Sequence, residues 1–100
     1  MNTRMWNALG SDETDLVGQW LLVDGRVEGD AVSDRIQWLL PRLDEIAHSA
    51  DGWDTLYRDH RDGRWWELTY PQSEMHGGGP QRLTNISPAA VKAKYGIATA

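Results

Sequence analysis

The sequence contains no cysteine, so the chain forms no disulfide and offers no thiolate to a metal ion. This composition is typical of a protein that works in a reducing compartment. Long apolar runs are also missing, because nothing approaches the roughly 20 apolar residues of a membrane-spanning helix. The polar start, MNTRMWNALGSDETD, has no apolar core of a secretion signal. We therefore expect a cytoplasmic protein that does not enter a membrane.

Basic residues are few: ten Lys and Arg stand against fifteen Asp and Glu, and the net charge is −5. All the acidic side chains lie at or before Glu74, whereas Arg82, Lys92 and Lys94 lie beyond it. An acidic chain is a poor match for nucleic acid. It suits a basic protein partner, because opposite potentials raise the rate of encounter. The alternative is that mild acidity only keeps the protein soluble.

The length of 100 residues predicts one domain with one core. We expect a flexible N-terminal arm at residues 1–14, a single α+β domain at 15–96 and a C-terminal tail at 97–100. The domain begins with a hairpin. Residues 16–23 are apolar and β-prone, Asp24-Gly25 favours a tight turn, and residues 26–28 return as a short strand.

A helix follows this hairpin, because apolar residues recur at spacings of three and four after Asp30 and Ser33, either of which can cap a helix. The apolar positions are Val32, Ile36, Leu39, Leu43 and Ile46, widened by Leu40 and Ala47. Pro41 lacks a backbone donor, so we expect it to kink or divide the helix. Residues 49–52 end it.

The second half of the chain predicts three strands and a short helix. Residues 53–59 and 64–70 are β-prone and flank a turn at residues 60–63 that ends in Asp-Gly. Alternation places Trp66, Leu68 and Tyr70 on one face and Trp65 and Glu67 on the other. A glycine-rich loop at 72–81 leads to a strand at 82–86. A helix at 89–95 then begins after Ser87-Pro88 and ends at Gly96.

These elements predict an α+β fold. We expect a small antiparallel sheet of about five strands, arranged as two hairpins plus one strand. It packs against one main helix and a short C-terminal helix, both on one face.

The segment from Gly52 to Gln81 holds three of the six tryptophans and two of the three tyrosines. Such aromatic side chains stack on bases in some proteins, but the interleaved carboxylates would repel phosphates. Aromatic side chains ringed by charges also describe a protein–protein hot spot. The alternative is that the aromatic side chains form the core while the charges pair across the hairpin.

Two other functions stay open at this point. Glu67, Glu74 and His76 have the chemistry of general acid–base catalysis, which would suit a small hydrolase, although no nucleophile or oxyanion hole is evident. Alternatively, the glycine-rich loop covers a small anionic ligand, with the backbone amides of residues 77–79 pointing into one cavity. No histidine pair has metal-ligand spacing, so we expect neither a metal nor a cofactor.

The residues from 13 to 96 resemble the immunity protein 27 family of bacterial polymorphic-toxin systems. The resemblance rests on Gly18-x-Trp20, Asp30, Arg35-Ile36, Gly52-Trp53-Asp54, Leu56-Tyr57-Arg58-Asp59, Asp62-Gly63-Arg64-x-Trp66-Glu67-Leu68-Thr69-Tyr70-Pro71, Ser73, Gly77 to Pro80, Leu83 and Lys94-Tyr95. His60 stands where the family usually has a proline, and Gln81 stands where a second proline often follows the glycines. Both departures loosen loops that proline would stiffen.

The resemblance implies a small cytoplasmic antidote, not an enzyme, that binds one toxin domain and blocks its active site or substrate path. On this hypothesis the partner is a toxin with a basic surface, the protein is a monomer or weak dimer, and neither nucleic acid nor membrane is bound. Trp65 and Tyr70 are the expected aromatic anchors. The expected electrostatic contacts to the basic toxin face are Asp59, Asp62, Glu67 and Glu74. The candidate toxin-binding residues are Asp59, Asp62, Arg64, Trp65, Glu67, Tyr70, Glu74 and His76.

Overall fold

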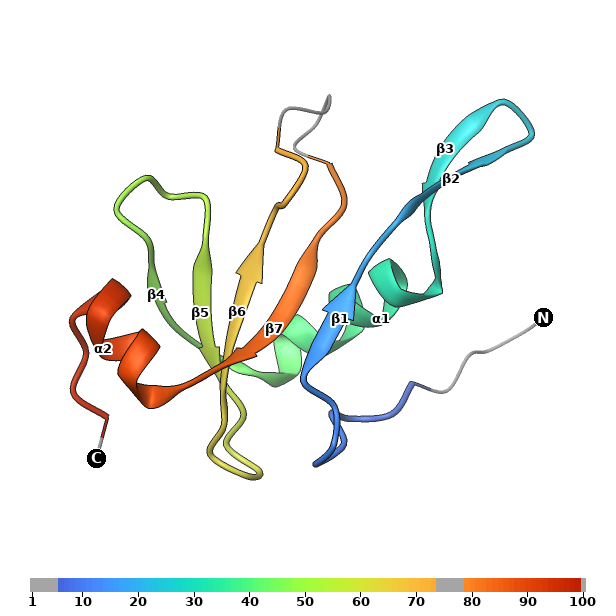
Figure 1. Cartoon of the computed structure of the whole chain (residues 1–100). Helices are drawn as coiled ribbons and strands as arrows, with labels where there is room; N and C mark the ends of the chain where they lie inside the picture. The colour runs from blue at the N-terminus through green and yellow to red at the C-terminus, as the bar shows by residue number, and fades with distance from the viewer. Residues whose placement is uncertain (1–5, 74–78, 100) are drawn as a thin grey trace.

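The computed structural model describes residues 6–73 and 79–99 and shows a five-stranded antiparallel sheet with a helix on each face (Figure 1). The strands lie in the order β1-β7-β6-β5-β4, and β2 and β3 form a separate two-stranded hairpin. The strands are β1 (Asp15–Val17), β2 (Trp20–Val23), β3 (Arg26–Gly29), β4 (Asp44–His48), β5 (Thr55–Arg58), β6 (Trp65–Thr69) and β7 (Arg82–Ile86). The helices are α1 (Ala31–Leu39), the single 3-10 turn η1 (Leu40–Arg42) and α2 (Pro88–Tyr95). The predicted α+β class is confirmed.

The two helices lie on opposite faces of the sheet, which corrects the expectation that both pack on one face. The reason is that β5 and β6 carry apolar side chains on both sides. The face toward α1 buries Ile36, Leu39, Tyr57, Trp66 and Leu68. The face toward α2 buries Leu56, Trp65 and Val91. Burying each of these side chains stabilises the fold by about 1.5–3 kcal/mol, so both helices are held by apolar packing.

The predicted first strand is two strands, because the chain leaves the main sheet at Gly18. The Gly18 amide donates to the carbonyl of Gln81 at 2.8 Å. A Cβ at this position would lie 2.7 Å from that same oxygen and 2.5 Å from Oγ of Ser33. Only glycine fits this close approach. Residues 15–17 therefore pair with β7, whereas residues 20–23 pair with β3.

The main helix is shorter than the apolar periodicity predicts. It ends at Leu39, tightens into one 3-10 turn that contains Pro41, and becomes extended at Leu43 with φ −104° and ψ 158°. Pro41 cannot donate a backbone hydrogen bond, so the helix stops instead of kinking. Residues 44–48 form the edge strand β4, and its register shifts between Glu45 and Ala47. Ile46, expected in the helical core stripe, lies at this irregularity and is exposed.

The predicted caps and turns agree with the structure. Asp30 caps α1, and its carboxylate accepts from the Ser33 amide at 2.8 Å. Ser87 caps α2, which ends at Gly96 in the left-handed conformation. Asp24 and Gly25 have φ values of 51° and 77°, the values that a two-residue hairpin turn requires.

Part of the segment expected as a flexible arm packs on the domain. Leu9 is 6 % exposed and belongs to the core under α1. The backbone amide of Asn85 donates to the carbonyl of Thr14 at 2.8 Å, which extends the pairing of β7 beyond β1. Residues 9–14 are therefore part of the folded unit.

Candidate interaction surface

Strand β6 separates the expected contact residues into three groups. Asp59, Asp62 and Arg64 lie in the turn before the strand, Trp65 and Glu67 lie on the strand itself, and Tyr70 follows it. The strand therefore holds the turn and Tyr70 at opposite ends of the sheet. Glu74 and His76 lie outside the described residues.

The turn between β5 and β6 is built around Asp59. Asp59 is 3 % exposed, and its carboxylate accepts from the Arg61 amide at 2.9 Å. Its own amide donates to the carbonyl of Arg64 at 2.9 Å, and its carbonyl accepts from the Gly63 amide at 2.7 Å. The side chain thus shapes the turn and offers almost no surface to a partner.

Arg64 ties this turn to the N-terminal segment. Its guanidinium donates to the carbonyls of Glu13 at 2.6 Å and Gly10 at 2.7 Å, and it pairs with Asp62 at 2.7 Å. Burial acts to raise the pKa of Asp62, but hydrogen bonds from Arg64 outweigh it and hold that pKa below its usual range. Asp62 and Arg64 are therefore engaged in contacts within the molecule.

The strand residues Trp65 and Glu67 face α2. Trp65 is 7 % exposed and packs against Val91, so in the free protein it is a core side chain and not an exposed anchor. Glu67 Oε2 accepts from the Tyr95 hydroxyl at 2.7 Å and lies 2.8 Å from the ammonium of Lys94. Burial, followed by the contact with Glu67, raises the pKa of the Tyr95 hydroxyl well above its usual value.

Lys94 joins the Glu67 cluster to a second carboxylate. Its ammonium lies 2.6 Å from Oδ2 of Asp54. Partial burial acts to lower the pKa of Lys94, but the hydrogen bonds to Asp54 and Glu67 outweigh it and raise the pKa. Lys94 therefore stays charged and links α2 to the sheet. Both partners of Glu67, Tyr95 and Lys94, belong to α2. These contacts give Glu67 a structural role, because they hold α2 against the sheet.

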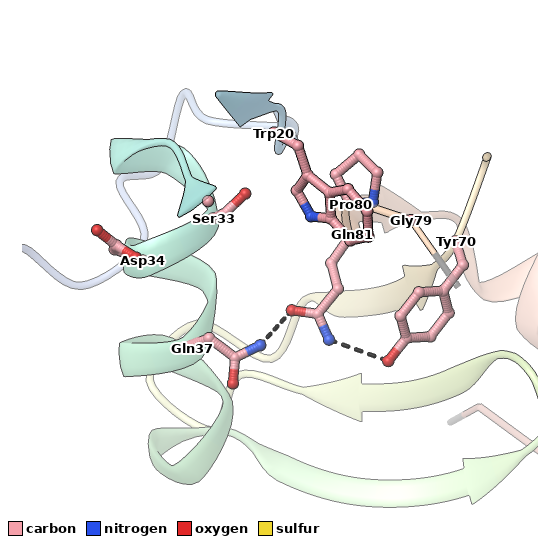
Figure 2. Close-up of a pocket in the computed structure, with 9 residues that line it drawn as sticks. Trp20, Ser33, Asp34, Gln37, Tyr70, Gly79, Pro80 and Gln81 are labelled. Carbon is pink, nitrogen blue, oxygen red and sulfur yellow. Dashed lines mark hydrogen bonds between the residues drawn. The ribbon is translucent and has the colours of Figure 1, made fainter. Parts of the chain in front are cut away.

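Tyr70 lines a groove of about 410 Å³ between α1, the base of the β2–β3 hairpin and the start of β7. Figure 2 shows Gln81 at its centre, where the side-chain amide joins Gln37 on α1 to the Tyr70 hydroxyl. Gln81 Nε2 donates to that hydroxyl at 3.0 Å. The groove is lined by Trp20, Gly29, Ser33, Asp34, Gln37, Tyr70, Gly79, Pro80 and Gln81.

The groove depends on a close backbone contact at Gly79. This residue has φ 76°, and a Cβ there would lie 2.4 Å from the carbonyl oxygen of Gln72. Glycine therefore lets the chain return tightly to β7 and brings Gln81 to Gln37 of α1. Of the three glycines expected to cover an anion, Gly77 and Gly78 lie outside the described residues, and Gly79 lines this groove.

The groove is acidic. Among the described residues that line it, Asp34 in the first turn of α1 carries the sole charge, and it is exposed. Asp30 lies between the lining residues Gly29 and Ser33 in sequence. Burial acts to raise the pKa of Asp30, but the hydrogen bond from the Ser33 amide and its other hydrogen bonds outweigh it and lower the pKa. Figure 2 shows the Asp34 side chain directed away from Gln81, so its charge favours a cationic group at the outer rim of the groove.

Next to Tyr70, an aromatic side chain stands open to solvent. Trp53, in the β4–β5 connection, is 49 % exposed. Its ring meets the Tyr70 ring edge-on, with centroids 5.7 Å apart and an interplanar angle of 71°. A contact of this geometry orders both rings. Trp53 and Tyr70 therefore form a rigid, partly open aromatic pair at the groove end of the sheet.

The β2–β3 hairpin carries the most exposed apolar side chains of the described chain. It is called the arm below and is distinct from the N-terminal segment at residues 1–14. Leu22 is 76 % exposed and Val27 is 63 % exposed, and Leu21 and Val23 are also open to solvent. Figure 1 shows the arm rising beyond the main sheet. Sequence reasoning predicted this hairpin but not its exposure. The available signal was the consecutive apolar residues Leu21 to Val23 on a strand with only one short partner.

Other chemical sites are not evident in the part of the chain that the structure describes. Residues 6–73 and 79–99 contain no group of three His, Asp or Glu side chains placed to hold a metal ion. Within the same ranges, neither helix has the length and apolar character to cross a membrane.

Comparison with models of known protein families gives a match. The family model described as Immunity protein 27 matches residues 22–87, which is more than half of the chain. Neither the curated proteins nor the solved structures contain a match. The matched range includes most of the arm, all of α1 and the sheet strands β4 to β7.

Proposed function

The chain belongs to the immunity protein 27 family, and from this we propose that it binds and neutralises a cognate bacterial polymorphic toxin domain in the cytoplasm. The observation that carries the proposal is the family match across residues 22–87. A protein partner also agrees with the open apolar and aromatic side chains at one end of the molecule, since such patches are typical of interaction sites.

Neutralisation follows from occupying the toxin's active site or its substrate path. We propose that the contact surface lies at the groove end of the sheet, with Tyr70 as an anchor beside Trp53. Glu74 and His76 follow Tyr70 in sequence and remain proposed contacts. The turn residues Asp59, Asp62 and Arg64 are engaged in contacts that shape the fold, so we assign them a supporting role.

Charge supports the choice of partner. The net charge of −5 and the carboxylates beside the groove suit a toxin domain with a basic face. Long-range attraction of this kind raises the association rate and is screened by salt. We therefore expect affinity to fall as ionic strength rises.

The test is titration calorimetry with the toxin domain encoded beside this gene, in catalytically inactive form, at low and high salt. An equimolar complex that weakens with salt, together with loss of activity when the active toxin is mixed with this protein, supports the proposal. A toxin domain that stays unbound, or that binds and remains active, refutes it.

A further inference from the structure

The two faces of the arm differ in chemistry. Cross-strand pairing sets Trp20 opposite Gly29 and Leu22 opposite Val27. Because side chains alternate along a strand, these residues share one face. That face is wholly apolar. Leu21, Val23, Arg26 and Glu28 share the other face, where Arg26 and Glu28 lie 3.7 Å apart as an ion pair.

The apolar face of the arm, defined by Trp20, Leu22 and Val27, continues into the groove. Trp20 and Gly29 line the groove as well as belonging to the arm. Figure 2 shows the Trp20 ring directed toward Pro80 and Gln81. Open apolar side chains and an acidic, hydrogen-bonding groove therefore form one surface that runs from the tip of the hairpin to Tyr70.

Among the described residues, hydrogen bonds anchor the arm to the domain at its base. The Asp30 amide donates to the carbonyl of Gln19 at 2.9 Å, and Ser33 Oγ donates to the same carbonyl at 3.4 Å. Every residue from 21 to 29 is exposed. A two-stranded hairpin without a covered face is marginally stable in water. Covering Leu22 and Val27 would therefore stabilise the arm and supply binding energy.

We propose that the apolar face of the arm and the groove at its base grip a protruding apolar segment of the toxin domain, with a basic toxin side chain at Asp34. This inference rests on the proposed function and names the surface that carries it. The apolar face buries the toxin segment, and the exposed carboxylate of Asp34 at the rim of the groove pairs with its basic group. The side chain of Gln81 offers the segment hydrogen bonds.

A second copy of this chain is a poorer occupant of the same surface. Each copy carries a net charge of −5 and the same acidic groove, and a two-fold contact would bring the two grooves together. Like charges placed opposite each other oppose association. The acidic groove therefore favours a basic partner over self-association.

A matched pair of double variants tests the proposal. Leu22→Thr with Val27→Thr changes the apolar face, and Leu21→Thr with Val23→Thr makes the same chemical change on the opposite face. All four positions are exposed, and threonine keeps a β-branched side chain in each strand. We expect the first variant to weaken affinity for the toxin domain about tenfold or more and the second by less than about twofold.

A charge variant tests the basic contact. Asp34→Asn should weaken binding and reduce its dependence on salt, whereas Asp12→Asn, at an exposed aspartate in the turn before β1, should change neither. Equal losses in both double variants, or unchanged affinity in the first, would overturn the proposal. A further outcome would also overturn it. In that outcome, sedimentation shows that the wild-type protein self-associates and that the first double variant is monomeric, while the toxin affinity of the variant is unchanged.

Hydrogen exchange on the unmodified protein tests the same surface without any substitution. In the equimolar toxin complex, amides of residues 20–29 should exchange more slowly than in the free protein. If the complex forms and the toxin is inhibited but these amides keep their free rates, the arm proposal fails and the proposed function stands. If no complex forms, both fail.

Discussion

Arg35 of α1 and Glu13 of the segment before β1 form a two-point ion pair, with Nη1 2.6 Å from Oε2 and Nη2 2.7 Å from Oε1. The same guanidinium donates to the carbonyls of Asn7 and Ala8 at 3.1 Å. Arg35 therefore fastens residues 7–13 onto the main helix. The hydrogen bonds from Arg35 lower the pKa of Glu13 from 4.5 to about 2, against the effect of burial.

Glu13→Gln should lower the free energy of unfolding by about 1 kcal/mol at pH 7, because it removes the charge of this pair. The folded pKa lies below the unfolded value, so the contribution is fully present above about pH 4.5 and is lost as pH falls toward 2. Urea unfolding at pH 7 and pH 3 measures it. The difference in unfolding free energy between Glu13→Gln and wild type should be smaller at pH 3 than at pH 7. Asp12→Asn should have the same unfolding free energy as wild type at both pH values. If the difference for Glu13→Gln is the same at both pH values, the charged pair of Glu13 with Arg35 is not its source.

Arg64→Lys separates a supporting role from a contact role. Lysine keeps the charge but loses the planar fork that reaches both Glu13 and Gly10. We expect a loss of about 1–2 kcal/mol in unfolding free energy and faster hydrogen exchange in residues 9–14. The exposed Arg61→Lys is the control, with no change expected. Weaker toxin binding at unchanged stability would instead make Arg64 a contact residue.

Glu67→Gln tests whether Glu67 has a structural role or contacts the toxin. The variant keeps an oxygen that accepts from the Tyr95 hydroxyl but loses the charge that pairs with Lys94. We expect the unfolding free energy to fall by about 1 kcal/mol, with toxin neutralisation unchanged at equimolar ratio. Lys94→Met should cause a larger loss, since it removes the ion pairs with both Glu67 and Asp54. Loss of neutralisation in a folded Glu67→Gln protein would contradict a purely structural role.

Much of the fold follows from local sequence signals. Ser87-Pro88 and Gly96 bound α2 because capping and left-handed termination depend on single residues. The alternation along β5 and β6 correctly assigns Trp65 and Trp66 to opposite faces, because strand geometry alone fixes it. Tertiary contacts decide the rest. Apolar spacing continues past Pro41, so Leu43 and Ile46 both fit a helical stripe in the sequence. In the structure Leu43 is buried in the core beside α1, whereas Ile46 lies in the edge strand β4 and is exposed.

The candidate site is harder to predict than the fold. An aspartate looks the same in sequence whether its carboxylate accepts from a backbone amide, as that of Asp59 does, or meets a partner, as proposed for Asp34. The sequence also shows two tryptophans on β6 without showing that helices cover both. Exposure is set by the distant elements that pack on a residue, and no local pattern encodes it. Leu22 and Val27 are apolar, β-prone and nevertheless uncovered.

Tyr70 provides the sharpest test of the groove. Tyr70→Phe keeps the ring contact with Trp53 but removes the hydroxyl that accepts from Gln81, so Gln81 is held only by Gln37. We expect toxin affinity to fall about fivefold, equivalent to one hydrogen bond of about 1 kcal/mol. Tyr70→Ala also removes the aromatic anchor and should cost tenfold or more.

Tyr95→Phe is the matched control, because it removes one hydrogen-bonding hydroxyl on the α2 face, away from the groove. It should lower the unfolding free energy by about 1 kcal/mol and leave toxin affinity unchanged. Calorimetric titration and urea unfolding of all three variants separate the two effects. If Tyr70→Ala binds the toxin as tightly as wild type, the groove is not part of the interface. If Tyr95→Phe weakens binding as much as Tyr70→Phe, the effect of the groove variant reflects stability and not contact.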